Sequence, residues 1–365
     1  MRNLISKLKE KEYKLIQYVK LDILFAKKCE FSRIHPELIP LWKKKFSQMI
    51  RYSSNRTFPI VEEFLTAKID RVSEREFRQK NPHKPILICV LKNEIDKIQY
   101  FMEHYRKLGI ENFVFLDNMS TDGTFEFLLE QKDAILYRCE HSFMSNRKIA
   151  WINRLIAEIG LNRWYLMVDS DEFITYLGCS EHNIEDVVMQ NKCKGFKRAG
   201  GVMIDMYPKE NLFTENEGSD FYRKCCYMDK DTYSFSEAAN GIRIMGGPRK
   251  RVFGTNMKLS KYCLFYFEED DIVPSSHFLI PFEKSFDVPV SIGILHYKFV
   301  NESDYQKMIE SVRTECYSNN SAEYKTYYNV LKDRNPVSLY DEKHSILFSE
   351  ENLRKIGLIE DMFSM

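Results

Sequence analysis

The chain has 365 residues, enough for one large α/β domain with additions or for two domains. Hydrophobic residues make up 44% of it and charged residues 29%, an ordinary globular balance that argues against extensive disorder. The formal net charge is +1, so no overall field attracts nucleic acid or an acidic polymer, and no nucleic-acid partner is expected.

Nine cysteines are scattered along the chain, an odd number with no Cys-x-x-Cys pair. No secretory signal is recognisable in the first ten residues. Together these features predict reduced thiols in a cytoplasmic protein. No apolar run approaches the roughly 20 residues that span a bilayer, so no transmembrane helix is expected.

Residues 1–83 are predicted to form a helical N-terminal extension. The first helix, residues 4–28, mixes lysines with apolar residues such as Leu15, Val19 and Ile23. A basic amphipathic helix can lie peripherally on the inner face of an anionic membrane. The favoured alternative is a helix docked on the main domain with its lysines in solvent. A second helix is expected to start after Thr57, with Pro59 in its first turn.

Residues 84–300 alternate short apolar runs with helical patterns. The runs predict strands at residues 86–91, 113–116, 135–137 and 165–168, and a helix is expected at 145–159. This alternation predicts an α/β domain with a mainly parallel central sheet and helices on both faces. Residues 301–365 are expected to form a C-terminal helical tail packed on this domain, with Ser303 and Gln306 as a capping box.

Polar side chains follow three of the predicted strands. They are Asn93 with Glu94, then Asp117, then Asp169 with Asp171. Because the carboxyl ends of parallel strands share one edge of a sheet, these side chains are expected to converge. Two carboxylates at positions i and i+2 suit a hard divalent cation that also holds phosphate oxygens.

These strand ends lie in three ordered motifs. The motifs are Lys92-Asn93-Glu94, Asp117-Asn118-Met119-Ser120-Thr121-Asp122-Gly123-Thr124 and Asp169-Ser170-Asp171-Glu172-Phe173. They resemble a bacterial subgroup of the glycosyltransferase family 2-like enzymes, which have the Rossmann-like GT-A fold. Two later blocks look like the same subgroup: Gly246-Gly247-Pro248-Arg249 and Leu295-His296-Tyr297-Lys298-Phe299.

The resemblance implies a hexosyltransferase that moves a sugar from a nucleotide-sugar, usually a UDP-sugar. The acceptor would be a glycan or lipid-linked glycoconjugate in bacterial surface polysaccharide synthesis, and the reaction is expected to invert the anomeric centre. By the same analogy Mn²⁺ or Mg²⁺ binds at the Asp-x-Asp motif, with Asp171 as a ligand. Asp169 would contact the ribose or the metal, and Asn93, Glu94 and Asp117 would lie near the base and ribose of the donor.

Later residues complete the expected site. His296 is a candidate third metal ligand, with a core histidine at a strand end as the equal alternative. Arg249 and Arg251 follow a Gly-Gly-Pro turn and are candidates for binding the diphosphate. An inverting enzyme needs a carboxylate base, and Asp205 is preferred over Glu237 for that role.

Two other functions remain open at this stage. One is a non-catalytic nucleotide-sugar-binding or scaffold protein of a glycan-assembly complex, although a scaffold would not need the acids of a metal site. The other is a nucleotidyltransferase that forms sugar nucleotides. That class would carry a glycine-rich loop after its first strand, and this chain has none there.

Overall fold

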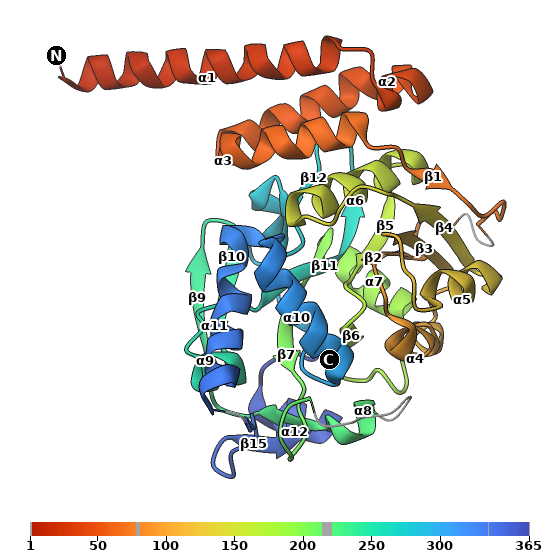
Figure 1. The fold of residues 1–365 in the computed structure, drawn as a ribbon, viewed down its shortest axis with the longest axis vertical. Coiled ribbons are helices and arrows are strands. Elements are labelled where there is room, and N and C mark those ends of the chain that lie inside the picture. The colour runs from red at the N-terminus through yellow and green to blue at the C-terminus, as the bar shows by residue number, and fades with distance from the viewer. Residues whose placement is uncertain (1, 78–80, 214–220, 335, 365) are drawn as a thin grey trace.

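The computed structural model describes residues 2–77, 81–213, 221–334 and 336–364. Its centre is a nine-stranded sheet in the order β1-β4-β3-β2-β5-β11-β7-β14-β6. Helices cover both faces of this sheet, and a layer of long helices from the N-terminus lies across one end of the molecule (Figure 1). The α/β class expected from the sequence is therefore confirmed.

Four neighbouring strands form the parallel half of the sheet. Their apolar runs are buried along most of their length, as expected for strands covered on both faces. They are β2 (Ile86–Leu91), β3 (Asn112–Asp117), β4 (Ala134–Arg138) and β5 (Arg163–Met167), in the order β4-β3-β2-β5. Their carboxyl ends consequently lie along one edge.

The other half of the sheet is mixed, which corrects the expectation of a mainly parallel sheet. β11 (Ser260–Phe267) runs antiparallel to both β5 and β7 (Arg198–Asp205). β14 (Val290–His296) is parallel to β7 and antiparallel to the edge strand β6 (Glu172–Thr175). The opposite edge is the short antiparallel strand β1 (Asp70–Arg71). A continuous apolar run such as β11 has no pattern that distinguishes a parallel from an antiparallel neighbour.

Alternate residues of β2 face two hydrophobic cores. Leu87 and Cys89 join a core with α4 (Ile95–Lys107), α5 (Thr124–Glu130) and α7 (Ile184–Cys193). Ile86 and Ile88 join a core with α6 (Ser145–Ile159) and the N-terminal helices. This two-residue alternation explains why both faces of the sheet carry helices.

The N-terminal layer contains α1 (Arg2–Ala26), α2 (Glu30–Ile34), the 3₁₀ turn η1 (Pro36–Leu38) and α3 (Ile39–Thr66). The first predicted helix is confirmed. The second begins earlier than expected: α3 starts at Ile39 and has a non-helical break at Ser53, and Pro59 lies inside it. α3 packs on α6 within one shared core, and β1 adds a strand to the sheet from within the predicted extension.

The remaining elements follow β7 and β14 in the chain and include short strands outside the nine-stranded sheet. The chain elements after β7 are α8 (Phe221–Lys224), β8 (Tyr227–Asp229), β9 (Tyr233–Ala238), β10 (Gly241–Gly246), α9 (Gly247–Phe253), β12 (Ile272–Ser275), β13 (Phe278–Ile280) and η3 (Phe282–Ser285). The C-terminal tail contains α10 (Glu302–Thr314), α11 (Ser318–Arg334), β15 (Ser345–Leu347) and α12 (Glu350–Ile356). The tail is mainly helical, but β15 pairs with β8. In α10 the cap is Asn301, which accepts from the Asp304 amide, and not the expected Ser303.

All nine cysteines lie in the described part of the chain and are free thiols. Among the described helices, none combines the length and the apolar character needed to cross a membrane.

Candidate active site

The predicted acids converge at the carboxyl edge of the sheet. Asn93 and Glu94 follow β2, and Asp169 and Asp171 follow β5. All four line one cleft with a volume of about 1320 Å³, together with Arg249 and His296. α10 and α11 contribute the other wall of this cleft. The sequence predicted this convergence for Asn93, Glu94, Asp117, Asp169 and Asp171; four of these residues line the cleft, and the buried Asp117 does not.

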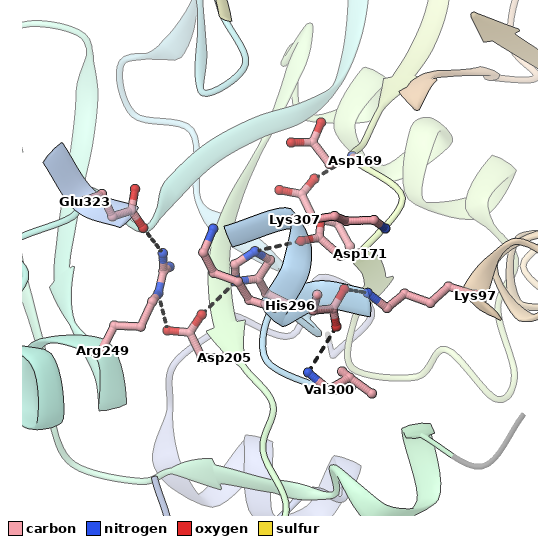
Figure 2. A network of polar contacts seen from close by, with 12 residues as sticks. Lys97, Asp169, Asp171, Asp205, Arg249, His296, Val300, Lys307 and Glu323 are labelled. Carbon is pink, nitrogen blue, oxygen red and sulfur yellow. Dashed lines mark hydrogen bonds and ion pairs between the residues drawn. The ribbon is translucent and has the colours of Figure 1, made fainter. Parts of the chain in front are cut away.

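His296 stands between two carboxylates (Figure 2). Its Nδ1 atom lies 2.7 Å from Oδ1 of Asp205, and its Nε2 atom lies 3.4 Å from Oδ2 of Asp171. The first contact follows from the sheet, because His296 of β14 and Asp205 of β7 are paired residues on parallel neighbours. Without a cation the two carboxylates favour the protonated ring; in the neutral ring that donates Nδ1–H to Asp205, Nε2 would be free to bind a cation together with Asp171.

Asp205 also belongs to a buried ion-pair chain. Its Oδ2 atom accepts from Arg249 Nε at 2.8 Å, and Arg249 Nη1 donates to Glu323 of α11 at 3.0 Å. Both oxygens of Asp205 are thus engaged, and the residue is only 2% exposed. This geometry does not favour the base role expected for Asp205, because a base needs an oxygen that reaches the acceptor hydroxyl.

The charges in this network reinforce one another. Burial alone would raise the pKa of Asp171, but His296, Lys298 and Lys97 hold it well below its ordinary value. Burial likewise opposes ionisation of Asp205, and Arg249 with His296 lowers its pKa to about 2. Desolvation lowers the pKa of His296, yet the two carboxylates raise it overall. The array is therefore built to keep both acids ionised.

The loop between β5 and β6 is braced by two lysines. Asp169 accepts from Lys148 of α6 at 2.5 Å, and Lys148 with Lys261 lowers the pKa of Asp169 to about 2 against the effect of burial. Glu172 is 2% exposed, is paired with Lys261, and accepts from the Asp169 amide at 2.9 Å. Glu172 therefore supports the loop, while Asp171 keeps an exposed side-chain fraction of 27%.

Two ion pairs attach α10 to the segment after β2, one to Glu94 and one to α4. Lys307 lies 2.7 Å from Glu94, and the buried Lys97 of α4 is paired with Asp304 (Figure 2). Burial raises the pKa of Glu94, and Lys307 partly offsets that rise. The second oxygen of Glu94 is buried and has no hydrogen-bond partner among the described residues. Glu94 lines the cleft as a residue, and this oxygen is its unused acceptor.

The other predicted donor-binding residues differ in their access to the cleft. Asn93 lines it, although its side chain also accepts from the Thr121 amide at 2.8 Å. Asp117 is fully buried, and its oxygens accept from the Ser120 amide. Arg251 is not among the residues that line the cleft, because Asp229 and the Leu339 carbonyl hold its guanidinium. The site thus brings Asn93 and Arg249 to the cleft but leaves Arg251 outside it.

Sequence reasoning missed the cationic lining of the cleft. Six lysines contribute to it: Lys92, Lys97, Lys148, Lys258, Lys298 and Lys307. Two of them had a visible signal, since Lys92 and Lys298 lie inside the quoted motifs. The others come from helices and loops whose positions depend on the fold. Such a lining suits an anionic ligand such as a diphosphate.

Asp171 and His296 offer the donor types of a divalent cation site. A carboxylate oxygen and an imidazole nitrogen suit Mn²⁺, and Asp205 contacts the other ring nitrogen of His296 and so orients the ring. Asp169 is turned to Lys148, so it does not share a tight cluster with the other two. Away from this site, two other groups of described residues have ligand atoms close enough together to hold a metal ion. They are Glu63, Cys139 and His141, and Glu268, Asp270 and Asp271.

No protein-family model and no curated protein match the sequence. Two solved structures are similar in part. The crystal structure of S. aureus TarS 1-349 is 12% identical over 69% of this chain and 72% of that chain, with a TM-score of 0.29. The crystal structure of HddC from Yersinia pseudotuberculosis is 9% identical over 62% of this chain and 99% of that chain, with a TM-score of 0.32. Superpositions this loose leave the function to be inferred from the geometry of the site.

Proposed function

We propose that this chain is a metal-dependent glycosyltransferase that uses a UDP-sugar and Mn²⁺ or Mg²⁺. The acceptor is a glycan or lipid-linked glycoconjugate of the bacterial surface. The observation that carries the proposal is the array of Asp171, His296 and Asp205 at the carboxyl edge of the sheet, within a lysine-lined cleft. The motifs around these residues support the same reading.

Asp171 and His296 would hold the cation, and Asp169 is a further ligand once Lys148 turns to a bound phosphate. When bound, the cation acts as a Lewis acid that neutralises charge on the departing nucleotide diphosphate. The residues of the chain act around it. Asp205 fixes the ring of His296 so that Nε2 faces the cleft. This positioning role replaces the base role expected for Asp205.

The donor is recognised by groups on both walls of the cleft. Lys148 and Lys298 supply positive charge near the acids, which favours a diphosphate over a neutral sugar. Glu94 offers its unpaired buried oxygen to a hydroxyl or amide of the donor, since such an oxygen is costly to leave without a donor. We assign Glu94 and Asn93 to the nucleoside end because they line the cleft beside β2.

A donor panel tests the proposal directly. The purified chain is incubated with individual UDP-sugars and Mn²⁺, and UDP release and donor loss are followed by NMR. Hydrolysis or transfer with at least one donor, abolished by a chelator, is expected. Binding of UDP by calorimetry without turnover of any donor would instead identify a scaffold. Turnover that is indifferent to the chelator would contradict the metal assignment.

A further inference from the structure

Helix α1 carries apolar side chains on two opposite faces. One face packs toward α3 and buries Leu21 and Phe25, with Phe25 and Phe46 in ring contact at 6.1 Å. The opposite face presents Leu15, Val19 and Ile23, which recur every four residues and so form one row. These three side chains are 64%, 48% and 55% exposed. A helix of a soluble domain normally turns only polar groups outward.

Within the described part of the chain, the row is left exposed. α1 lies at the outer side of the N-terminal layer and extends beyond α3 into open space (Figure 1). Ile16, beside the row, is 46% exposed as well. A continuous apolar ridge on an outer helix marks a contact surface.

Charge is strongly segregated between this layer and the rest of the chain. Residues 1–66, which end with α3, contain 14 lysines and arginines against 7 acids, a net charge of +7. Residues 67–365 contain 40 against 46, a net charge of −6. The overall value of +1 conceals this division. Within residues 13–26 of α1 the single acidic residue is Asp22. Its carboxylate is already paired with Lys43 of α3 at 2.9 Å.

We propose that α1 docks the protein on an anionic phospholipid surface, with the row Leu15–Val19–Ile23 inserted among the lipids and the lysines of the layer against the headgroups. An exposed row of aliphatic side chains fits acyl chains, and the net charge of +7 on residues 1–66 fits anionic headgroups. A second copy of the chain would bring two equally basic layers together, which like-charge repulsion disfavours.

Vesicle co-sedimentation of the full chain tests this docking. The wild type is mixed with phosphatidylcholine vesicles or with vesicles that also contain phosphatidylglycerol. Binding is expected only with the anionic lipid, and it should weaken as salt is added. The triple variant Leu15→Ser/Val19→Ser/Ile23→Ser should reduce the vesicle partition coefficient about tenfold or more, because the apolar part of the contact is lost.

The matched control is Leu129→Ser/Met189→Ser/Leu347→Ser, which removes three exposed apolar side chains from the acidic part of the chain. It should bind vesicles like the wild type. An unchanged thermal unfolding temperature of the α1 variant will confirm that Leu21 and Phe25 still pack. The proposal is overturned if the wild type ignores anionic vesicles or if both triple variants bind equally. A dimer in light scattering that the α1 variant dissociates would also overturn it, since a second copy would then cover the row.

Discussion

Among the single residues of the cleft, the carboxylates differ in whether an oxygen remains free. Asp205 gives one oxygen to His296 and the other to Arg249, and its side chain is 3% exposed. Asp171 has only the longer contact to His296 and is far more exposed. A ligand that enters the cleft therefore meets Asp171 and not Asp205. Asp171 is therefore placed to contact a ligand, and Asp205 is placed to position His296.

Asp205→Asn discriminates between these roles. As a positioning residue, Asp205 orients His296, so the variant should lose about 10- to 100-fold in metal affinity or activity. The Mn²⁺ concentration for half-maximal rate should rise. A catalytic base would instead cost about 10²- to 10⁴-fold in kcat with the metal dependence unchanged. Steady-state rates over a Mn²⁺ titration measure both quantities, and the second pattern would restore the base role.

Individual site residues were predictable only as far as their signals were local. Asp171 and His296 lie in compact motifs at strand ends, so the chain itself indicated them. Arg251 also lay in a motif, but its partner Asp229 is 22 residues away and was not identifiable as one. Whether Arg249 or Arg251 faces the cleft depends on how α9 and its flanking loops fold. The spacing of the two residues in the sequence does not decide it.

At the scale of elements, α10 is attached to α4 by a buried ion pair. Lys97 and Asp304 are 2% and 8% exposed, and Asp304 also accepts from the Val300 amide at 3.0 Å. The carboxylate of Asp304 raises the pKa of Lys97 above its ordinary value against the effect of burial. This pair therefore holds the helix that forms one wall of the cleft.

Lys97→Met should lower the free energy of unfolding by about 3–5 kcal/mol, because it leaves a buried carboxylate without its cation. The double variant Lys97→Met/Asp304→Asn should recover part of that loss, since the amide oxygen still accepts from Val300. Urea unfolding followed by circular dichroism measures both. Equal destabilisation by the single and double variants would show that the charge of Asp304 is not the cause.

A second element contact predicts a pH dependence. Lys45 of α3 is buried, and its Nζ donates to the carbonyls of Glu268 at 2.8 Å and Asp271 at 2.7 Å. Desolvation lowers its pKa to about 7, and the carboxylates of Asp271 and Asp270 only partly oppose this. The ordinary value in an unfolded chain is about 10.4. Between these values the unfolded chain binds more protons than the folded one.

The stability of the wild type relative to Lys45→Met should therefore rise from pH 7 to pH 10, by up to about 1.4 kcal/mol per pH unit. Below about pH 7 the difference should level off, because both states are then protonated. Urea unfolding of the two proteins at several pH values provides the comparison. A stability difference that stays constant or falls across this range would contradict the lowered pKa of Lys45.

Elements were predictable where their patterns were long and uninterrupted. β2 and α6 have the bounds expected from their apolar periodicity. The direction of β11 and the cap of α10 were not predictable in the same way. A strand's neighbour is set by tertiary packing, and Asn301 and Ser303 are both competent cap residues. Local sequence preferences therefore do not fix the direction of a strand or the choice between two cap residues.

For the molecule as a whole, the N-terminal layer and the sheet share one core. The tilted rings of Trp42 and Phe64 of α3 have centroids 4.8 Å apart within it, and the fully buried Arg154 of α6 donates to the Phe64 carbonyl at 2.9 Å. The guanidinium of Arg154 also lies 4.7 Å from the ring centroid of Phe31. The helices of residues 30–66 therefore complete the fold, whereas α1 adds only a few side chains, such as Leu21 and Phe25, to this core.

Deletion of residues 1–66 should yield an insoluble chain, because it exposes the apolar face of α6 and leaves Arg154 without its partners. Deletion of residues 1–28 removes mainly α1 and should leave a soluble, folded chain. Solubility after expression and far-ultraviolet circular dichroism compare the two truncations. If the longer deletion is as soluble and as stable as the shorter one, the shared core does not stabilise the fold.

The most direct test of the account is the initial rate of UDP release from a UDP-sugar as Mn²⁺ is titrated. It is measured for the wild type, for Asp171→Asn and for Asp70→Asn, a matched change on the exposed edge strand. The wild type and Asp70→Asn should show the same saturable dependence on Mn²⁺, and Asp171→Asn should lose about 100-fold or more in rate. Equal rates for all three proteins, with or without the metal, would contradict a metal-dependent sugar transfer centred on Asp171.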